Sequence, residues 1–540
     1  MKKKRTTRAI ILCLVLAAAL VLTACNKNTQ QTSNPEQPTT TPPSASQPGQ
    51  GGTPTAPAAE PTVLRARIRG DIKNLDPCHV TGPNDEHVVR QVYEGLIRFK
   101  PGTSDIQLMV AEKFEILNDL EIYFKLREGV QFQRGYGEVT AEDVKWTYER
   151  FIDPATASAY KSDWGSLDHV EVISKYEGKI VLSEPLGALM TNTLPYSSGM
   201  IQCRKHFEAV GADKYAFDPV GCGPYEFVKW IPNERTEMKR YPGYWGAQCY
   251  YDEIHIIPIG DDTVAEVALQ AGDIDYSQIS LTSMDRFDGK NGYKVSVYNG
   301  ARYAWVGMNM ENPKLENLNV RLAIRYGIDV QSILDAAYDG IAPWARAAIP
   351  EGRVGYWADA PKYERDVAKA KDYMAKAGIT TLDLELAIEN TLEWRTWAEI
   401  IQQNLAEVGI NIKINAMEGG AFWSIGEGDK GKEVELFCMS YSAAGEPSWY
   451  TQWFTKEQIG EWNWMRWSSS EFDELHQQGM VTIDPAKRTP IYIEAQKVWD
   501  KACNAVWVTH TVHVFAHKDN IDTLFMQGSP IPVLRDFKAK

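Results

Sequence analysis

The sequence of 540 residues lacks the short motifs that mark several large classes of enzyme and metal site. It has no Cys-x-x-Cys pair, which argues against a zinc site or a dithiol redox centre. It also has no Gly-x-Ser-x-Gly, no His-Glu-x-x-His and no Gly-x-x-x-x-Gly-Lys-Ser/Thr. We therefore expect a protein that is not an enzyme and uses no cofactor. Any ATP hydrolysis linked to it must occur on a partner subunit.

Histidine is scarce, with nine residues in the whole chain. Three of them, His510, His513 and His517, lie close together near the C-terminus. The neighbouring Val512 and Val514 predict a strand, and on a strand positions 510 and 513 face opposite sides of the sheet. The spacing therefore does not predict a metal site.

Basic residues are outnumbered by acidic ones, and the chain has a formal charge of −14. Removal of the first 24 residues would take away five Lys/Arg and no acids, which leaves 52 basic against 71 acidic residues and a charge of −19. A surface of this sign repels phosphate groups, so we expect no nucleic-acid partner.

The longest apolar run, from Ala9 to Leu22, follows five basic residues and is too short for an ordinary membrane span. It predicts a secretory signal peptide over residues 1–24. Leu22-Thr23-Ala24-Cys25 resembles a bacterial lipobox, which implies a diacylglyceryl group on Cys25 and a protein anchored by lipid on the outer face of the cell membrane. The alternative is an ordinary cleavage site with a chance cysteine.

Large apolar side chains are nearly absent from residues 25–62, which are rich in Pro, Thr, Ser, Gln, Gly and Ala. Such a segment buries too little surface to offset the entropy cost of ordering the chain, so we expect a disordered linker.

Six cysteines then remain in the body of the protein. They allow fifteen complete pairings, and spacing does not choose among them. These cysteines are Cys78, Cys203, Cys222, Cys249, Cys438 and Cys503.

The remaining sequence alternates between strand and helix patterns. Apolar periodicity, cap residues and terminal glycines predict each element. Thr140 is a good N-cap for a helix, with Asp143 as its capping-box partner. The predicted strands are 63–69, 225–230, 236–240, 253–259, 306–310, 382–388 and 410–414, and the predicted helices are 86–98, 140–151, 263–271, 319–328, 366–376 and 393–407.

The stretch Asp218 to Gly246 reads Pro-Val-Gly-x-Gly-Pro-Tyr, a strand, and then Tyr-Pro-x-Tyr-Trp-Gly. This order resembles the family 5 extracellular solute-binding proteins, which are the peptide/nickel-type receptors of ABC importers. Further sequence motifs that resemble the family are LDP, VYEGLIRF, LREGVQF followed by TAEDV, and VRLAIRYGID. Together they cover nearly all of residues 63–540.

The resemblance implies an α/β fold with two lobes, like periplasmic binding proteins of type II, and an extra domain inserted in lobe one. Lobe one would comprise residues 63–96, 218–304 and 505–540, the inserted domain 97–217, and lobe two 305–504. The crossings near Arg302 to Gly307 and near Asn504 to Val508 would form a hinge. A ligand would then bind between the lobes as they close.

The segment from Leu436 to Trp467 is dense in aromatic residues, which suit either core packing or ligand contact. Tyr441 and Trp449 flank the Gly445-Glu446-Pro447 turn, where relatives carry their ligand loop, so we prefer them as ligand contacts. Three acids beside aromatic side chains would suit a cationic or amine ligand, although each would equally suit a solvated surface. The full set of predicted ligand-binding residues is Tyr441, Trp449, Glu446, Glu389, Glu393 and Trp423.

The loop departs from the pattern of many peptide-binding relatives, Trp-x-x-Asp-x-x-Glu/Asp-Pro, in which the Asp pairs with the α-ammonium of the peptide. Counting back from Glu446 places Ala443 at the Asp position, and a shift by one residue places Ala444 there. Recognition of a free N-terminus is therefore not predicted. A dipeptide-carboxylate arginine is also missing before the 393–407 helix, where the sequence reads Ile388-Glu389-Asn390.

The resemblance implies a monomeric lipoprotein receptor that captures a peptide or similar small organic solute and delivers it to the permease and ATPase subunits of an ABC importer. The same fold would also serve an oligosaccharide, an opine or a cationic amine. An alternative of another class is a secreted glycoside or peptide hydrolase, although the sequence contains no recognisable catalytic pair.

Cys203 and Cys222 replace the Pro and Thr usual in the family pattern, which implies a disulfide where the inserted domain rejoins lobe one.

Overall fold

The computed structural model describes residues 60–443, 445–526 and 531–540. The predicted signal peptide, Cys25, most of the predicted linker and Ala444 lie outside these residues. Within the described part of the chain, no helix has the length and apolarity needed to span a bilayer.

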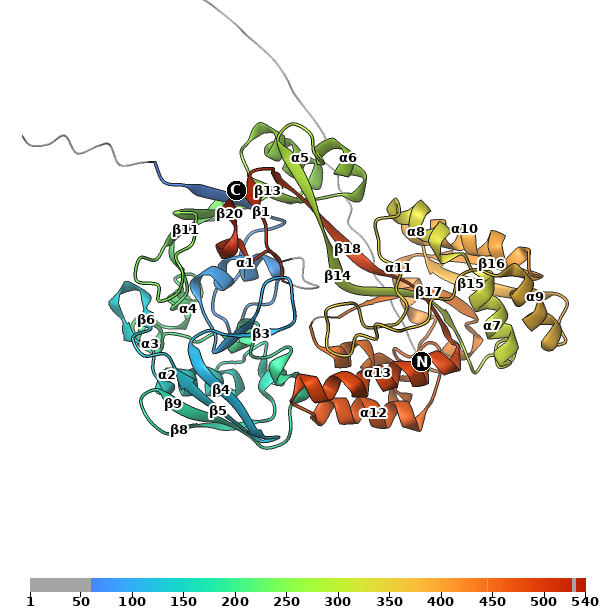
Figure 1. The fold of residues 1–540 in the computed structure, drawn as a ribbon, viewed down its shortest axis with the longest axis horizontal. Helices are drawn as coiled ribbons and strands as arrows, with labels where there is room; N and C mark the ends of the chain where they lie inside the picture. Colours follow the sequence, from blue (N-terminus) through green and yellow to red (C-terminus); the bar gives the residue numbers. More distant parts are fainter. Residues whose placement is uncertain (1–59, 444, 527–530) are drawn as a thin grey trace, which may run out of the picture. The chain divides into compact units, whose positions relative to one another are not determined.

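A mixed sheet of ten strands forms the centre of the fold (Figure 1). Its strands, in spatial order, are β10 (Tyr225–Ile231), β11 (Arg235–Arg240), β12 (Glu253–Pro258), β1 (Val63–Ile68), β13 (Tyr276–Ile279), β18 (Ala505–Lys518), β14 (Tyr293–Met308), β17 (Leu436–Ser442), β15 (Leu382–Glu389) and β16 (Ile410–Met417).

The long strands β14 and β18 run antiparallel beside each other and join the two halves of this sheet (Figure 1). Their register shifts between Asn299 and Tyr303, where a Cβ on Gly300 would lie only 2.6 Å from the Thr511 Oγ1 atom. A glycine is therefore required for this close approach. The 306–310 strand of the sequence prediction is the end of β14, which begins much earlier, at Tyr293.

Each half of the sheet pairs strands with helices. In the first half, α5 (Asp262–Ala271) connects β12 to β13, and both strands lie parallel to β1. Beside the second half lie α7 (Leu318–Gly327), α8 (Val330–Tyr338), α9 (Val367–Lys376) and α10 (Leu392–Ala406). The α11 helix (Gly419–Ser424) follows β16, and α12 (Ser470–Val481) and α13 (Pro485–Ala502) precede β18.

Alternate residues of the second half build two cores on the two faces of the sheet. On β14, Ala304 and Val306 face the core that contains α7, α8 and α10. Tyr303 and Trp305 face an aromatic core on the other side. The aromatic segment predicted from the sequence therefore contributes much of a core, with some rings left exposed.

Residues between β2 and β10 form a separate four-stranded antiparallel sheet with its own core. Thr140 caps α2, and its N–H donates to the Asp143 carboxylate at 2.9 Å, which confirms the predicted capping box. The elements of this region are β4 (Ala111–Asn118), β5 (Glu121–Leu126), β9 (Glu177–Leu182) and β8 (Leu167–Val172), with α2 (Ala141–Ile152), α3 (Arg204–Val210) and α4 (Ala212–Tyr215). The short strand pairs are β2 (Ile97–Phe99) with β3 (Ile106–Leu108), β6 (Gln131–Phe132) with β7 (Gly137–Glu138), and β19 (Ile521–Asp522) with β20 (Lys538–Ala539). The short helix α6 (Met284–Phe287) precedes β14.

The loop before the β10–β11 hairpin closes the end of α1 (Pro83–Val92). Gly223 N–H donates to the Val92 carbonyl oxygen at 2.9 Å, and a Cβ on Gly221 would lie 2.2 Å from that oxygen. This contact ends the helix at Val92, so the prediction of a helix as far as Arg98 was wrong. Residues 97–99 instead form β2.

All six cysteines of the described residues are free thiols. Cys203 and Cys222 lie in the same buried core, but the disulfide predicted between them is absent from the structure. Both side chains pack among apolar neighbours, and burial raises the pKa of the Cys203 thiol to about 11. These two residues act here as small apolar core residues.

Candidate functional site

The two halves of the large sheet each contain a group of parallel strands: β1, β12 and β13 in the first half, and β15, β16 and β17 in the second. The carboxyl ends of the two groups point toward each other along β14. The last residue of β13, Ile279, pairs with Val514, which pairs with Val297 of β14. From the opposite direction, the last residue of β17, Ser442, pairs with Arg302 of β14. Ligands of open α/β sheets bind outside the carboxyl ends of the strands, so this stretch of β14 marks the candidate site.

Helix N-termini gather at the same edge. The β15 strand ends at Glu389, and α10 begins at Leu392 after the N-cap Thr391. The β16 strand ends at Met417, and α11 begins at Gly419. A Cβ on Gly419 would lie 2.8 Å from the Glu389 carboxylate, so the predicted residue Glu389 lies directly beside this turn.

A charged cluster lies where α10 meets β14 and β17. The Arg302 guanidinium donates to the Ser440 hydroxyl at 2.6 Å and lies 3.3 Å from the Glu393 carboxylate. It also lies over the Trp394 ring, and the Tyr338 hydroxyl donates to Glu393. The predicted ligand residue Glu393 thus lies at this edge, but an arginine already balances its charge, which weakens the argument for a cationic ligand.

Aromatic rings form the other part of the edge. Tyr441 is buried and its hydroxyl donates to the Trp462 carbonyl oxygen at 2.6 Å, so it supports the neighbouring rings. Trp423 lies against both Tyr441 and Trp462. The exposed fractions are 37% for Trp423, 37% for Trp449 and 45% for Trp462. Three indole rings are therefore available to stack on a ligand.

Trp449 is held by β14, because the Tyr303 hydroxyl donates to its carbonyl oxygen at 3.3 Å. The structure thus places Glu389, Glu393, Trp423, Tyr441 and Trp449 around the ends of the strands that flank β14.

Glu446 has a different position from the one predicted. It is fully buried and forms an ion pair with Arg488, which is also fully buried. The Thr191 hydroxyl and the Ser448 N–H also donate to it. Burial opposes its ionisation, but Arg488 and these donors outweigh burial, and the pKa of Glu446 lies below its usual value. In this structure Glu446 is therefore a packing residue that a ligand does not reach.

The C-terminal histidines each bind a different group. His510 Nε2 lies 2.9 Å from the Ala348 carbonyl oxygen, and His513 lies 3.3 Å from the Gln278 amide nitrogen. His517 lies within hydrogen-bonding distance of Ser296 and of the Lys518 carbonyl oxygen. Across the described residues no cluster of three His, Cys, Asp or Glu is arranged to hold a metal ion.

Sequence reasoning missed Arg302 and Ser440 as members of this edge. Arg302 was missed because it precedes the predicted 306–310 strand, whereas the strand in the structure already includes it. Ser440 was missed because β17 was not predicted as a strand. A full strand pattern from Tyr293 would have placed Arg302 on the same face as Ala304 and thus toward α10.

The chain matches the family model described as bacterial extracellular solute-binding proteins, family 5 middle, over residues 105–461. It belongs to this family. The glutathione-binding protein GsiB of Escherichia coli O6:K15:H31 is 27% identical over 478 residues, which cover 84% of this chain and 90% of GsiB.

Solved structures show the same fold. HbpA2 from Haemophilus parasuis has a TM-score of 0.79 and 22% identity, and the match covers 88% of this chain and 100% of that one. DppA from Helicobacter pylori, in complex with the peptide STSA, has a TM-score of 0.63 and 24% identity over 88% and 98% of the two chains. The two-lobed fold predicted from the sequence is thereby confirmed. GsiB and DppA are named as binding proteins.

Proposed function

We propose that this protein is the substrate-binding lipoprotein of an ABC importer, which captures a peptide or a related small organic solute between two lobes and delivers it to the permease. The observation that carries the proposal is the meeting of two groups of strand ends at residues 297–302 of β14, beside exposed indole rings and an arginine–glutamate pair. Such an edge offers stacking surface and polar partners to one solute.

The proposal includes the lobes and hinge expected from the sequence. Lobe one would comprise 63–96, 218–304 and 505–540, with 97–217 inserted, and lobe two 305–504. Two features support a hinge at β14 and β18: only these long strands continue from one half of the described sheet to the other, and their pairing is irregular near Gly300. Closure about such strands would bring the opposing strand ends onto the ligand.

The ligand class is tested by native mass spectrometry of whatever purifies with the protein, since a tightly held solute survives gentle isolation. We expect a peptide or a related small organic solute. An oligosaccharide, an opine or an amine would replace the peptide assignment while leaving the receptor assignment in place. Turnover of a glycoside or peptide by the purified protein would instead favour a hydrolase.

Free N-terminal ammonium groups are not expected to add affinity, because Ala443 is buried and supplies only a backbone N–H, which donates to the Ala301 carbonyl oxygen. Loss of one partner of a desolvated ion pair costs about 3–5 kcal/mol, or on the order of a hundredfold or more in affinity. Calorimetry of the ligand-stripped protein should therefore show weak binding of a free dipeptide and similar binding of its N-acetylated twin.

Tight binding of the free dipeptide together with failure of its acetylated twin would contradict this expectation. In that case Glu389 or Glu393 would be the acid to replace first, because both lie at the strand ends. Glu389→Gln and Glu393→Gln are a matched pair, since only Glu393 is paired with an arginine in the described residues.

Lipidation at Cys25 predicts that Cys25→Ser leaves the precursor uncleaved or releases the protein from the membrane. The reason is that the serine hydroxyl does not accept the diacylglyceryl group on which anchoring depends. Membrane fractionation with labelled fatty acid measures both effects, and Cys249→Ser is the control because Cys249 lies in the folded body. Unchanged membrane retention of the Cys25→Ser variant would exclude the lipid anchor.

A further inference from the structure

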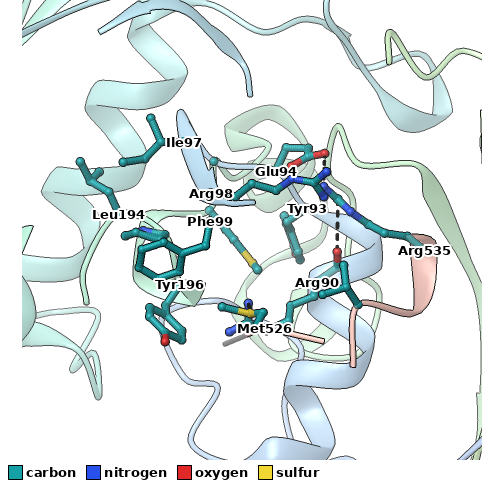
Figure 2. Close-up of a pocket in the computed structure, with 14 residues that line it drawn as sticks. Arg90, Tyr93, Glu94, Ile97, Arg98, Phe99, Leu194, Tyr196, Met526 and Arg535 are labelled. Carbon is teal, nitrogen blue, oxygen red and sulfur yellow. Dashed lines mark hydrogen bonds and ion pairs between the residues drawn. The ribbon is translucent and has the colours of Figure 1, made fainter. Parts of the chain in front are cut away.

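A small pocket lies where three segments of the chain meet (Figure 2). Its walls come from the end of α1 together with β2, from the segment 194–200, and from residues near the C-terminus. Its volume is about 50 Å³. One water-sized group needs about 10–15 Å³, so the space admits roughly four such groups. This is the size of a small side chain.

The pocket borders the candidate site on two sides. Tyr196 lines it, and the Tyr196 hydroxyl lies close to the turn after β17, since a Cβ on Gly445 would be only 2.8 Å away. Met526 lines it from another direction, directly after Phe525, whose ring packs on Tyr298 of β14 with 3.7 Å between the ring centroids. Tyr298 belongs to the stretch of β14 that marks the candidate site. A solute bound there therefore has the pocket beside it.

Most of the pocket wall is apolar. The Phe99 ring lies edge-on to the Tyr196 ring, with 5.8 Å between the centroids. Leu194, Met200 and Met526 also line the pocket and are almost completely buried. Methionine side chains are flexible and adapt their shape to a neighbouring apolar group. These walls suit an apolar occupant that is removed from water.

Three arginines of the described residues line the pocket, and each lies beside one carboxylate. The pairs are Arg90 with Glu86 at 2.6 Å, Arg98 with Asp536 at 3.4 Å, and Arg535 with Glu94 at 2.8 Å. The three positive charges are therefore balanced by three negative ones. A charged occupant would lose its hydration without gaining an unpaired counterion, so the pocket favours a neutral one.

Arg90 provides one further contact. Its Nη2 atom is buried without a hydrogen-bond partner within the described part of the chain. Its guanidinium lies over the Tyr196 ring, 5.2 Å from the ring centroid. Because Glu86 already balances the charge of Arg90, the partner that suits this N–H is a neutral acceptor, such as a peptide carbonyl oxygen.

We propose that this pocket selects one neutral, apolar side chain of the bound solute, of the size of leucine, and that Arg90 binds a carbonyl oxygen next to it. The inference rests on the proposed function and narrows its peptide-like solutes to those that carry such a side chain. The volume excludes an indole ring, and the balanced charges exclude an acidic or basic side chain.

The first test measures the binding of tripeptides to ligand-stripped protein by calorimetry. Each buried methylene raises affinity about fourfold, so leucine, with three more carbons than alanine, should raise it on the order of fiftyfold. We therefore expect one of Leu-Ala-Ala, Ala-Leu-Ala and Ala-Ala-Leu to bind about fiftyfold more tightly than trialanine. Tryptophan or glutamate at the same position should lose this gain. Equally tight binding of the tryptophan or glutamate peptide would overturn the proposal.

The second test enlarges the pocket. Phe99→Ala removes one wall, so the tryptophan peptide should gain on the order of tenfold in affinity while the leucine peptide loses affinity. Tyr196→Ala, which opens the same wall, is the second variant should Phe99→Ala fail to fold by circular dichroism. The matched control is Phe472→Ala, which removes a fully buried ring from the core beside α12. An unchanged preference for leucine over tryptophan in a folded pocket variant would overturn the proposal.

The third test observes the pocket directly through its methionines. In protein labelled with ¹³C-methyl methionine, Met200→Leu and Met526→Leu assign the two signals. The leucine peptide should shift both signals, whereas Met374, which lies in the core beside α9, should not respond. A bound leucine peptide that shifts neither signal would overturn the proposal.

A last experiment separates the inference from the function on which it rests. If wild-type protein binds none of the tripeptides, the peptide assignment fails, and 3-methylbutanamide then probes the pocket by itself. This molecule carries an isobutyl group and one neutral carbonyl oxygen. A shift of the Met200 and Met526 signals that is lost in Phe99→Ala supports the pocket. The absence of a shift overturns it.

Discussion

Replacing Arg488 with methionine is expected to destabilise the folded protein by about 3–5 kcal/mol, because the Glu446 carboxylate would remain buried without its cation. Arg488 Nη1 lies 3.1 Å from Glu446, and both side chains are fully buried. The pair also joins distant segments, since Thr191 donates to Glu446 and Arg488 donates to the Gly187 carbonyl oxygen. Chemical denaturation followed by circular dichroism measures the loss.

The double variant Glu446→Gln, Arg488→Met is the control for this prediction. It removes both charges and should recover a large part of the lost stability, since neutral groups carry a much smaller burial cost. Equal stability of Arg488→Met and the wild type would contradict the assigned role.

Acidification from pH 6.5 toward pH 4 is expected to unfold the protein, because burial lowers the pKa of six histidines in the described residues. Burial is the main cause that lowers the pKa of His87, His476, His510 and His513 to about 4. In the unfolded chain each would have a pKa of about 6.5, so below that value the unfolded state binds more protons. The stability is fully present above pH 6.5 and falls as pH approaches the folded-state pKa values.

The expected slope is on the order of 5 kcal/mol per pH unit for four protons, and most domains have a total stability of only about 5–15 kcal/mol. Neighbouring charges change these pKa values less than burial does. Glu86 and Arg90 act on His87 in opposite directions, as do Glu446 and Arg488 on His476, whereas His510 faces backbone carbonyl groups. Urea titrations at several pH values measure the slope, and His510→Gln should reduce it by one proton.

A denaturation midpoint that stays constant between pH 7 and pH 4.5 would contradict this prediction. Carboxylates are the other groups that titrate in acid, but their ordinary pKa values are about 4. A decline that begins only below pH 4 would therefore point to acids such as Glu446 rather than to histidines.

Local signals in the sequence predicted the local parts of the fold. The capping box of Thr140 and Asp143 and the β10–β11 hairpin depend on residues that are close in the chain, and both are present. The end of α1 was missed because Gly223, far along the chain, terminates it. The start of β14 was missed because its pairing with β18 joins segments about two hundred residues apart.

The candidate site was harder to predict for the same reason. Glu446 resembles a ligand-loop acid in the sequence, but its partner Arg488 lies 42 residues away and its donor Thr191 lies 255 residues away. Arg488 has no motif around it that would pair it with Glu446, because the ion pair is a property of the packed structure.

The aromatic core beside β14 should make the intrinsic tryptophan fluorescence of this protein sensitive to ligand binding. Eight of the seventeen tryptophans are connected by ring contacts through Tyr441 and its neighbours. They are Trp305, Trp423, Trp453, Trp462, Trp464, Trp467, Trp499 and Trp507. With several ring centroids only about 5–6 Å apart, excitation of any one ring passes readily to the others. A solute that covers Trp423 or Trp462 would therefore change the emission of the whole network, and unlabelled protein would register its occupancy as a change in intrinsic fluorescence.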